Sequence, residues 1–148
     1  MALTKNGTSA GRSGSECQMS FALIVAGISG AMGVGFGAFA AHGLARLGDP
    51  TIVEWVKTGA GYQLWHAAAL LGLASLSGRI APLWFGVLGG CFFLGSLLFG
   101  GSLYVLALVQ WPWVVFVTPV GGMLMIIGWV LLIILGWRHF HAAKRSTP

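Results

Sequence analysis

Three long stretches of this chain carry no charged side chain, and they limit what it can fold into. Lysine, arginine, aspartate and glutamate are absent between Glu16 and Arg46, between Lys57 and Arg79, and between Arg79 and Arg138. A helix that crosses a membrane needs about 20 apolar residues, because the hydrocarbon layer is about 30 Å thick and each residue rises about 1.5 Å. The first two stretches each fit one crossing, and the third fits two. The charge pattern therefore predicts four transmembrane helices.

The composition favours lipid as the main solvent of the chain. Charged residues make up 7% and hydrophobic residues 57% of the sequence, whereas about 25% of an ordinary soluble domain is charged. So few charges cannot cover a water-facing surface. We therefore expect an all-α integral membrane protein, a four-helix bundle with a short interfacial helix between spans 1 and 2.

The apolar runs and the polar ends divide the chain into three parts. The membrane domain is expected over residues 20–137, with spans at about 20–43, 60–77, 82–109 and 118–137. Residues 1–19 are rich in Gly, Ser and Thr, which predicts a disordered polar tail. Residues 138–148 form a basic C-terminal tail. The two termini lie on the same side of a protein with four spans.

The loop between the first two spans contains signals for a helix start. Asp49 followed by Pro50 is typical of a cap and a first helical residue, while Thr51 with Glu54 would instead form a capping box. Either start predicts a short amphipathic helix that lies at the membrane interface. Trp55 is the expected interfacial anchor of that helix.

The basic residues predict the orientation in the membrane. The side that holds both termini carries most of them, whereas the opposite side holds Arg46 and Lys57. Lysine and arginine accumulate in cytoplasmic loops, so both termini are expected in the cytoplasm, and the membrane is the cell membrane if the chain is bacterial. The residues on the termini side are Lys5, Arg12, Arg79, Arg138, Lys144 and Arg145.

Glycines recur at helical spacing in the first and third spans. No hydrophobic effect drives helices together inside lipid, so small residues that allow close backbone approach are favoured at helix contacts. Span 1 is expected to be the central helix for this reason. The glycines predicted to serve helix packing are Gly27, Gly30, Gly33, Gly37, Gly89 and Gly100.

Four polar side chains near the first connection form the candidate site: His42, Tyr62, Gln63 and His66. Spans 1 and 2 are antiparallel, so both histidines fall in the same half of the membrane. A shared pocket there would accept a small polar ligand, a lipid headgroup, a quinone or a metal. The alternative is structural: His42 caps span 1, and His66 forms an interhelical hydrogen bond with Tyr104, Ser102 or a backbone carbonyl.

Four motifs occur in order along the chain: GAFAAHGL (37–44), TGAGYQLWHAAALL (58–71), FGGSLYVLAL (99–108) and TPVGGMLMIIGW (118–129). Together they resemble the family of small membrane proteins called domain of unknown function 423, which includes YgdD-like proteins. Ala40 stands where the family usually has glycine. The resemblance covers about residues 20–137 and implies four helices with both termini on one side. It implies no particular activity, substrate or cofactor.

The spans contain neither a carboxylate pair nor a Ser/His/Asp set, so the sequence predicts no enzyme. We expect a structural or assembly protein that contacts membrane lipid and pairs with a second copy or another membrane protein. A small-solute or proton-linked transporter that uses Tyr62 and His66 is the alternative. Two histidines without a carboxylate or thiolate make a poor ligand set, so neither metal nor cofactor is predicted. The scattered basic residues do not predict nucleic-acid binding.

Overall fold

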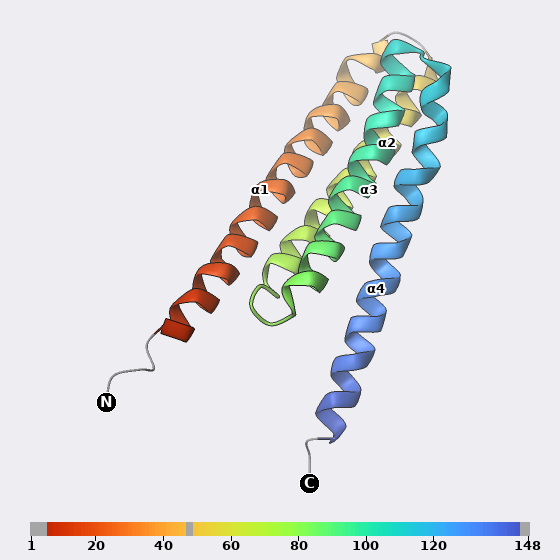
Figure 1. Ribbon diagram of the computed structural model, residues 1–148. Coiled ribbons are helices and arrows are strands. Elements are labelled where there is room, and N and C mark those ends of the chain that lie inside the picture. The colour runs from red at the N-terminus through yellow and green to blue at the C-terminus, as the bar shows by residue number, and fades with distance from the viewer. Residues whose placement is uncertain (1–5, 47–48, 146–148) are drawn as a thin grey trace, which may run out of the picture.

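The computed structural model describes residues 6–46 and 49–145, and its regular structure in these residues is entirely helical (Figure 1). The all-α prediction is therefore confirmed. The four long helices are α1 (Asn6–His42), α2 (Pro50–Ala74), α3 (Pro82–Val109) and α4 (Val117–Arg145). Two 3₁₀ segments, η1 (Leu44–Arg46) and η2 (Pro112–Phe116), lie in the connections.

The helices alternate in direction along the chain. In Figure 1 the α1–α2 and α3–α4 connections lie at one end, and the two termini and the α2–α3 turn lie at the other. Each helix packs mainly against its neighbours in sequence, and α1 and α4 do not touch within the described residues. The inner pair is therefore α2 and α3, so the expectation that span 1 is the central helix is wrong.

Helix α2 begins at the predicted cap. Oδ1 of Asp49 accepts hydrogen bonds from the backbone N–H groups of Thr51, at 2.8 Å, and Ile52, at 3.4 Å. The helix then continues without a break to Ala74, so the structure does not separate an interfacial helix from span 2. Gly59, just before the predicted start of span 2, is buried against α3 and stays helical.

Helix α1 begins earlier than the sequence predicts. Residues 6–19 belong to α1 instead of a disordered tail, and residues 1–5 lie outside the described part of the chain. Arg12 and Glu16 face each other one turn apart, at 3.9 Å. The backbone carbonyl of Ser15 also accepts a hydrogen bond from the hydroxyl of Ser77, in the α2–α3 turn. These contacts favour continuation of the helix past the apolar run.

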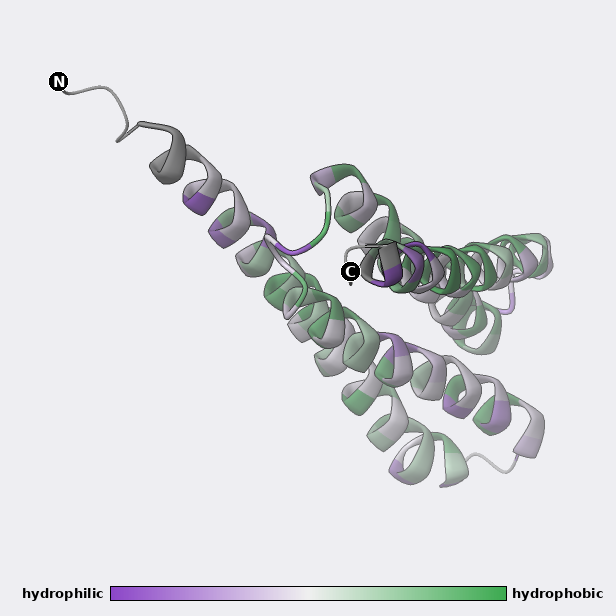
Figure 2. Ribbon diagram, turned by 90° about the horizontal axis from the view of Figure 1, so that it is seen from below, coloured by the Kyte–Doolittle hydropathy of each residue, from purple (hydrophilic) through white to green (hydrophobic). Residues whose placement is uncertain are grey.

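The outer surface of the helices is largely apolar. Three helical stretches of the described chain, 11–46, 82–109 and 112–142, are long and hydrophobic enough to cross a membrane. Figure 2 shows hydrophobic residues over most of the helical turns, with more hydrophilic ones near the N-terminus. Large hydrophobic side chains are exposed on α1 and α4, among them Phe21, Ile24, Ile28, Met123, Ile126 and Ile133. Helix α2 is not among these three stretches, and its polar side chains Gln63 and His66 are buried.

Glycines bring the backbones of neighbouring helices together. A Cβ added to Gly59 would lie 3.1 Å from Cα of Gly100, so α2 and α3 are in backbone contact there. A Cβ added to Gly121 would lie 2.4 Å from the backbone nitrogen of Phe99 and 2.7 Å from the carbonyl oxygen of Gly95. The contact between α3 and α4 thus leaves no room for a side chain at Gly121.

The glycines singled out in the sequence fall into three groups. Gly33 and Gly100 lie at tight contacts between helices, with neighbours about as close as those of Gly59. A Cβ added to Gly30, Gly37 or Gly89 would make an ordinary van der Waals contact with a neighbouring helix. Gly27 is exposed, and a Cβ there would meet nothing within 4 Å, so the prediction that it packs against another helix of the chain is wrong.

Candidate functional site

Gln63 links three helices in the interior. Its side chain is fully buried on α2, with 0% exposed. Its Oε1 accepts a hydrogen bond from the hydroxyl of Tyr104 on α3 at 2.7 Å, and its Nε2 points to the sulfur of Met32 on α1 at 3.9 Å. The Tyr104 ring stacks on Phe36 of α1, with ring centres 3.7 Å apart. An amide in an apolar interior needs such partners, because an unpaired one costs free energy.

The glycines at the close approach of α2 and α3 leave space for the amide of Gln63. A Cβ on Gly100 would lie 3.1 Å from Cγ of Gln63 and 3.1 Å from the carbonyl oxygen of Gly59. Either glycine replaced by a larger residue would push the two helices apart. The pair Gly59 and Gly100 therefore positions the Gln63–Tyr104 hydrogen bond.

His66 lies one turn further along α2 and is also buried. Its Nδ1 lies 2.8 Å from the carbonyl oxygen of Tyr62, and its Nε2 lies 3.2 Å from Nε1 of Trp129 on α4. Phe92 of α3 packs beside both rings, with centroids 5.7 Å from His66 and 4.9 Å from Trp129. The imidazole is thus held by α2, α3 and α4.

The partners of His66 assign its protonation state. An indole nitrogen can only donate, so Nε2 of His66 must accept. A backbone carbonyl can only accept, so Nδ1 must carry the proton. His66 is therefore a neutral imidazole with both nitrogens engaged. Binding a metal or moving a proton at either nitrogen would require one of these hydrogen bonds to break.

Tyr62 contributes its ring to the same region. The ring lies parallel to that of His66 at 6.3 Å and tilted against Phe99 of α3 at 4.6 Å. Tyr62, Gln63 and His66 thus lie together on α2, as their spacing predicts. Gln63 contacts Tyr104, and His66, one turn further along the helix, contacts Trp129.

His42 is not brought to these residues. It is exposed at the end of α1, and its neighbour Ala40 belongs to a buried cluster with Val56 near the start of α2. His66 follows Val56 by ten residues, which is about 15 Å along a helix axis. The single pocket that would join both histidines therefore remains a prediction, and the described contacts do not support it.

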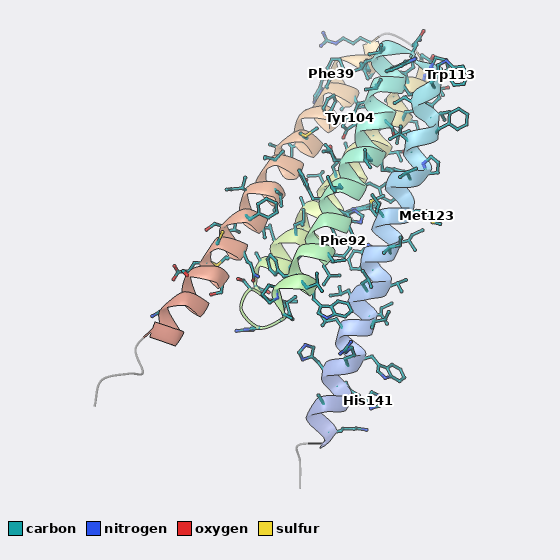
Figure 3. All side chains as sticks on the ribbon, viewed as in Figure 1. Phe39, Phe92, Tyr104, Trp113, Met123 and His141 are labelled. Carbon is teal, nitrogen blue, oxygen red and sulfur yellow. The ribbon has the colours of Figure 1, made fainter. Side chains whose placement is uncertain are left out.

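Two partners of buried polar side chains, Trp129 and Thr118, were not predicted from the sequence, and Trp129 is itself 44% exposed. Nε1 of Trp129 donates to Nε2 of His66, and Thr118 Oγ1 lies 2.8 Å from Oγ of Ser102 on α3. Figure 3 shows Tyr104 and Phe92 on the central helix α3, whereas Trp113 lies at the α3–α4 connection. Both missed residues stand within the fourth motif, TPVGGMLMIIGW. The fourth motif follows a long apolar run, and this position was the sequence signal that could have pointed to both residues.

The described residues contain no group of three or more His, Cys, Asp or Glu side chains that could hold a metal ion. Three pairs of polar side chains connect neighbouring helices, whereas Ser29 is buried on α1 without a hydrogen-bond partner, and large apolar side chains are exposed outside. This arrangement defines a helical membrane protein whose interior polar groups hold helices together.

The chain belongs to the family described as "Protein of unknown function (DUF423)", which matches residues 36–122. This confirms the resemblance seen in the motifs. The matched region includes Gln63, His66 and Tyr104 and ends before Trp129.

Bacterial relatives cover most of the chain. UPF0382 inner membrane protein YgdD of Escherichia coli K12 is 43% identical over 114 residues, which are 77% of this chain and 87% of the relative. A UPF0382 membrane protein of Staphylococcus aureus is 41% identical over 78% of this chain and 94% of its own. One from Haemophilus influenzae is 39% identical over 74% and 88%. No solved structure matches.

Proposed function

We propose that this protein is a non-enzymatic membrane protein that works by assembly, as a small helical bundle that associates with lipid and with a second protein chain. The observation that carries the proposal is the pairing of its interior polar groups. Gln63 is bonded to Tyr104 and His66 to Trp129. Side chains used in this way stabilise the fold and leave the outer surface for interaction.

In this proposal α2 is the fourth crossing, although it is not among the three stretches that are long and hydrophobic enough to cross a membrane. Its buried polar residues face α1, α3 and α4, not the lipid, so their partners offset the cost of placing them in the membrane. In the proposed orientation both termini lie in the cytoplasm, because lysine and arginine accumulate on that side of a membrane protein. The four helices then form one membrane domain, with η1 and η2 at the outer face.

A row of small residues on α1 supports the assembly role. Gly27, Ala31 and Gly35 follow one another at four-residue spacing and are all exposed. A Cβ on Gly27 or Gly35 would meet nothing within 4 Å. Small residues at this spacing let a second helix approach closely in lipid, and no other helix among the described residues covers Gly27 or Gly35.

The experiment compares oligomeric state in lipid. Native mass spectrometry from nanodiscs is expected to show the wild-type protein as a complex of two or more chains. The variant Gly27→Leu with Gly35→Leu is expected to be monomeric. The control variant Gly61→Leu with Gly101→Leu fills two open positions on α2 and α3 and is expected to keep the complex. A wild-type protein that is always monomeric, and that retrieves no partner in mild detergent, would contradict the assembly role.

The transporter alternative gives the same residues a different role, in which His66 carries a proton. Proton movement through His66 requires its hydrogen bond with Trp129 or with Tyr62 to open. It predicts solute flux in proteoliposomes that depends on pH and disappears in His66→Leu. Absence of such flux, together with a loss of stability in His66→Leu, is the result that the assembly role predicts.

A further inference from the structure

A groove of about 440 Å³ lies between the α2–α3 turn and the last turns of α4. This volume is in the range of small-molecule sites, which are about 300–1,000 Å³. The groove is separate from the Gln63 and His66 contacts. Its lining residues are Leu76, Arg79, Ile80, Leu132, Leu135, Gly136 and His139.

The two ends of the groove differ in chemistry. Leu132 and Leu135 form its wall on α4, and His139 follows one turn later, further out along the helix. Arg79 stands opposite on the α2–α3 turn and is exposed. The groove is thus apolar toward the middle of the protein and carries basic side chains at its mouth.

The surroundings of the mouth strengthen its basic character. The guanidinium of Arg138 lies 5.8 Å from the centre of the Trp84 ring, close to the groove in sequence and space. No acidic residue lines the groove. Asp49 and Glu54 lie at the opposite end of α2, and Glu16 faces Arg12 on α1. An anion at the mouth would meet complementary charge.

We propose that this groove is a binding site for an anionic membrane phospholipid. The phosphate lies between Arg79 and His139, and part of one acyl chain lies along Leu132, Leu135 and Leu76. The assignment rests on the proposed membrane placement of this end of the protein. Two features support this occupant: the apolar wall matches an acyl chain, and the basic mouth matches a phosphate at headgroup depth.

Native mass spectrometry of the full chain, titrated with defined lipids in detergent, tests the site. The probes are phosphatidylglycerol, phosphatidylcholine with the same acyl chains, and the single-chain lysophosphatidylglycerol. The wild-type protein is expected to retain phosphatidylglycerol several-fold better than phosphatidylcholine, and at least as well as lysophosphatidylglycerol. The variant Arg79→Gln is expected to weaken phosphatidylglycerol binding about five-fold, the effect of one cation near an anionic surface.

Two sets of variants distinguish binding in the groove from a general effect of charge and from misfolding. The pair His42→Gln and Arg46→Gln removes the same two side-chain types as His139→Gln and Arg79→Gln, but at the opposite end of the protein, and is expected to leave binding unchanged. Gly136→Leu fills the groove without touching its charges, because a Cβ there meets nothing within 4 Å, and is expected to abolish selective binding. Gly101→Leu is the control for this change.

Several results would overturn the site. These are equal retention of phosphatidylglycerol and phosphatidylcholine, equal weakening by the two charge pairs, or unchanged binding in Gly136→Leu. Retention of the single-chain lipid in preference to the two-chain lipid also rejects a membrane phospholipid as the occupant. The same spectra report the number of chains, so loss of the assembly role and loss of the lipid site are distinguishable.

Discussion

The indole of Trp129 donates a hydrogen bond to Nε2 of His66 and so connects α4 to α2, although the backbones of these helices stay apart in the described residues. The contact passes beside Phe92 of α3, which packs on both rings. Three helices are therefore tied at one level by one polar contact inside an aromatic cluster. This relationship gives His66 a structural role that its position alone does not reveal.

The Gln63–Tyr104 contact predicts a measurable loss of stability on removal of one partner. Tyr104→Phe leaves Oε1 of Gln63 buried without a donor and is expected to cost about 1–2 kcal/mol in unfolding free energy. Tyr62→Phe serves as the control and is expected to change stability by less than about 0.5 kcal/mol. Unfolding in mixed micelles measures both. If Gln63→Leu with Tyr104→Phe cost as much as the two single changes together, the hydrogen bond would not be the cause.

Gly121 is predicted to be the least replaceable glycine between α3 and α4. Gly121→Ala places a methyl group against the backbone of Phe99 and Gly95, which cannot rotate away, and is expected to cost about 3 kcal/mol or more. Gly101→Ala places the same group in open space and is expected to stabilise the helix by about 0.5–1 kcal/mol. Thermal unfolding of both variants in detergent is the measurement. Equal effects at the two positions would reject the close contact.

The start of α2 depends on Asp49. Asp49→Ala removes the oxygen that accepts from Thr51 and Ile52, and loss of such a cap costs about 0.5–2 kcal/mol. Faster hydrogen exchange is expected in the first turn of α2, with little change near His66. Glu54→Ala tests the capping box as the alternative start. A larger effect from Glu54→Ala than from Asp49→Ala would favour that alternative.

The proposed topology predicts which cysteines react from outside the cell. Three single-cysteine variants report on three points: natural Cys17, Ala45→Cys in η1, and Ser75→Cys after α2. A membrane-impermeant maleimide is expected to label only Ala45→Cys in intact cells. Labelling of both Ala45→Cys and Ser75→Cys would show that α2 does not cross. Labelling of Cys17 and Ser75→Cys alone would reverse the orientation.

Local signals in the sequence predicted much of the helical framework. Charge-free stretches located the apolar helices, and Asp49–Pro50 marked the start of α2, because a cap acts within one turn. The end of the predicted interfacial helix was harder to predict. Nothing in residues 57–60 shows that Gly59 meets Gly100, a tertiary contact that keeps the helix continuous.

The candidate site could be predicted only in part, because its contacts between helices are also tertiary and do not show in the local sequence. The four-residue spacing of Tyr62 and His66 is a property of one helix, so it was readable from the sequence. The partner of His66 depends on how α4 packs against α3, and Gly121 and Gly128, which permit that packing, lie far from His66 in sequence. The distance between His42 and His66 depends on where α2 begins, and α2 begins ten residues before the predicted span.

A double-mutant cycle on His66 and Trp129 tests the central claim most directly, namely that the interior polar groups act as structural ties. The unfolding free energy is measured in mixed micelles for the wild-type protein, His66→Leu, Trp129→Phe and the double variant. A coupling energy of about 0.6 kcal/mol, and no more than about 1.7 kcal/mol, is expected for a hydrogen bond inside a membrane protein. The claim would be contradicted if the two single losses of unfolding free energy summed to that of the double variant within about 0.3 kcal/mol, because substitutions at sites that do not interact are additive.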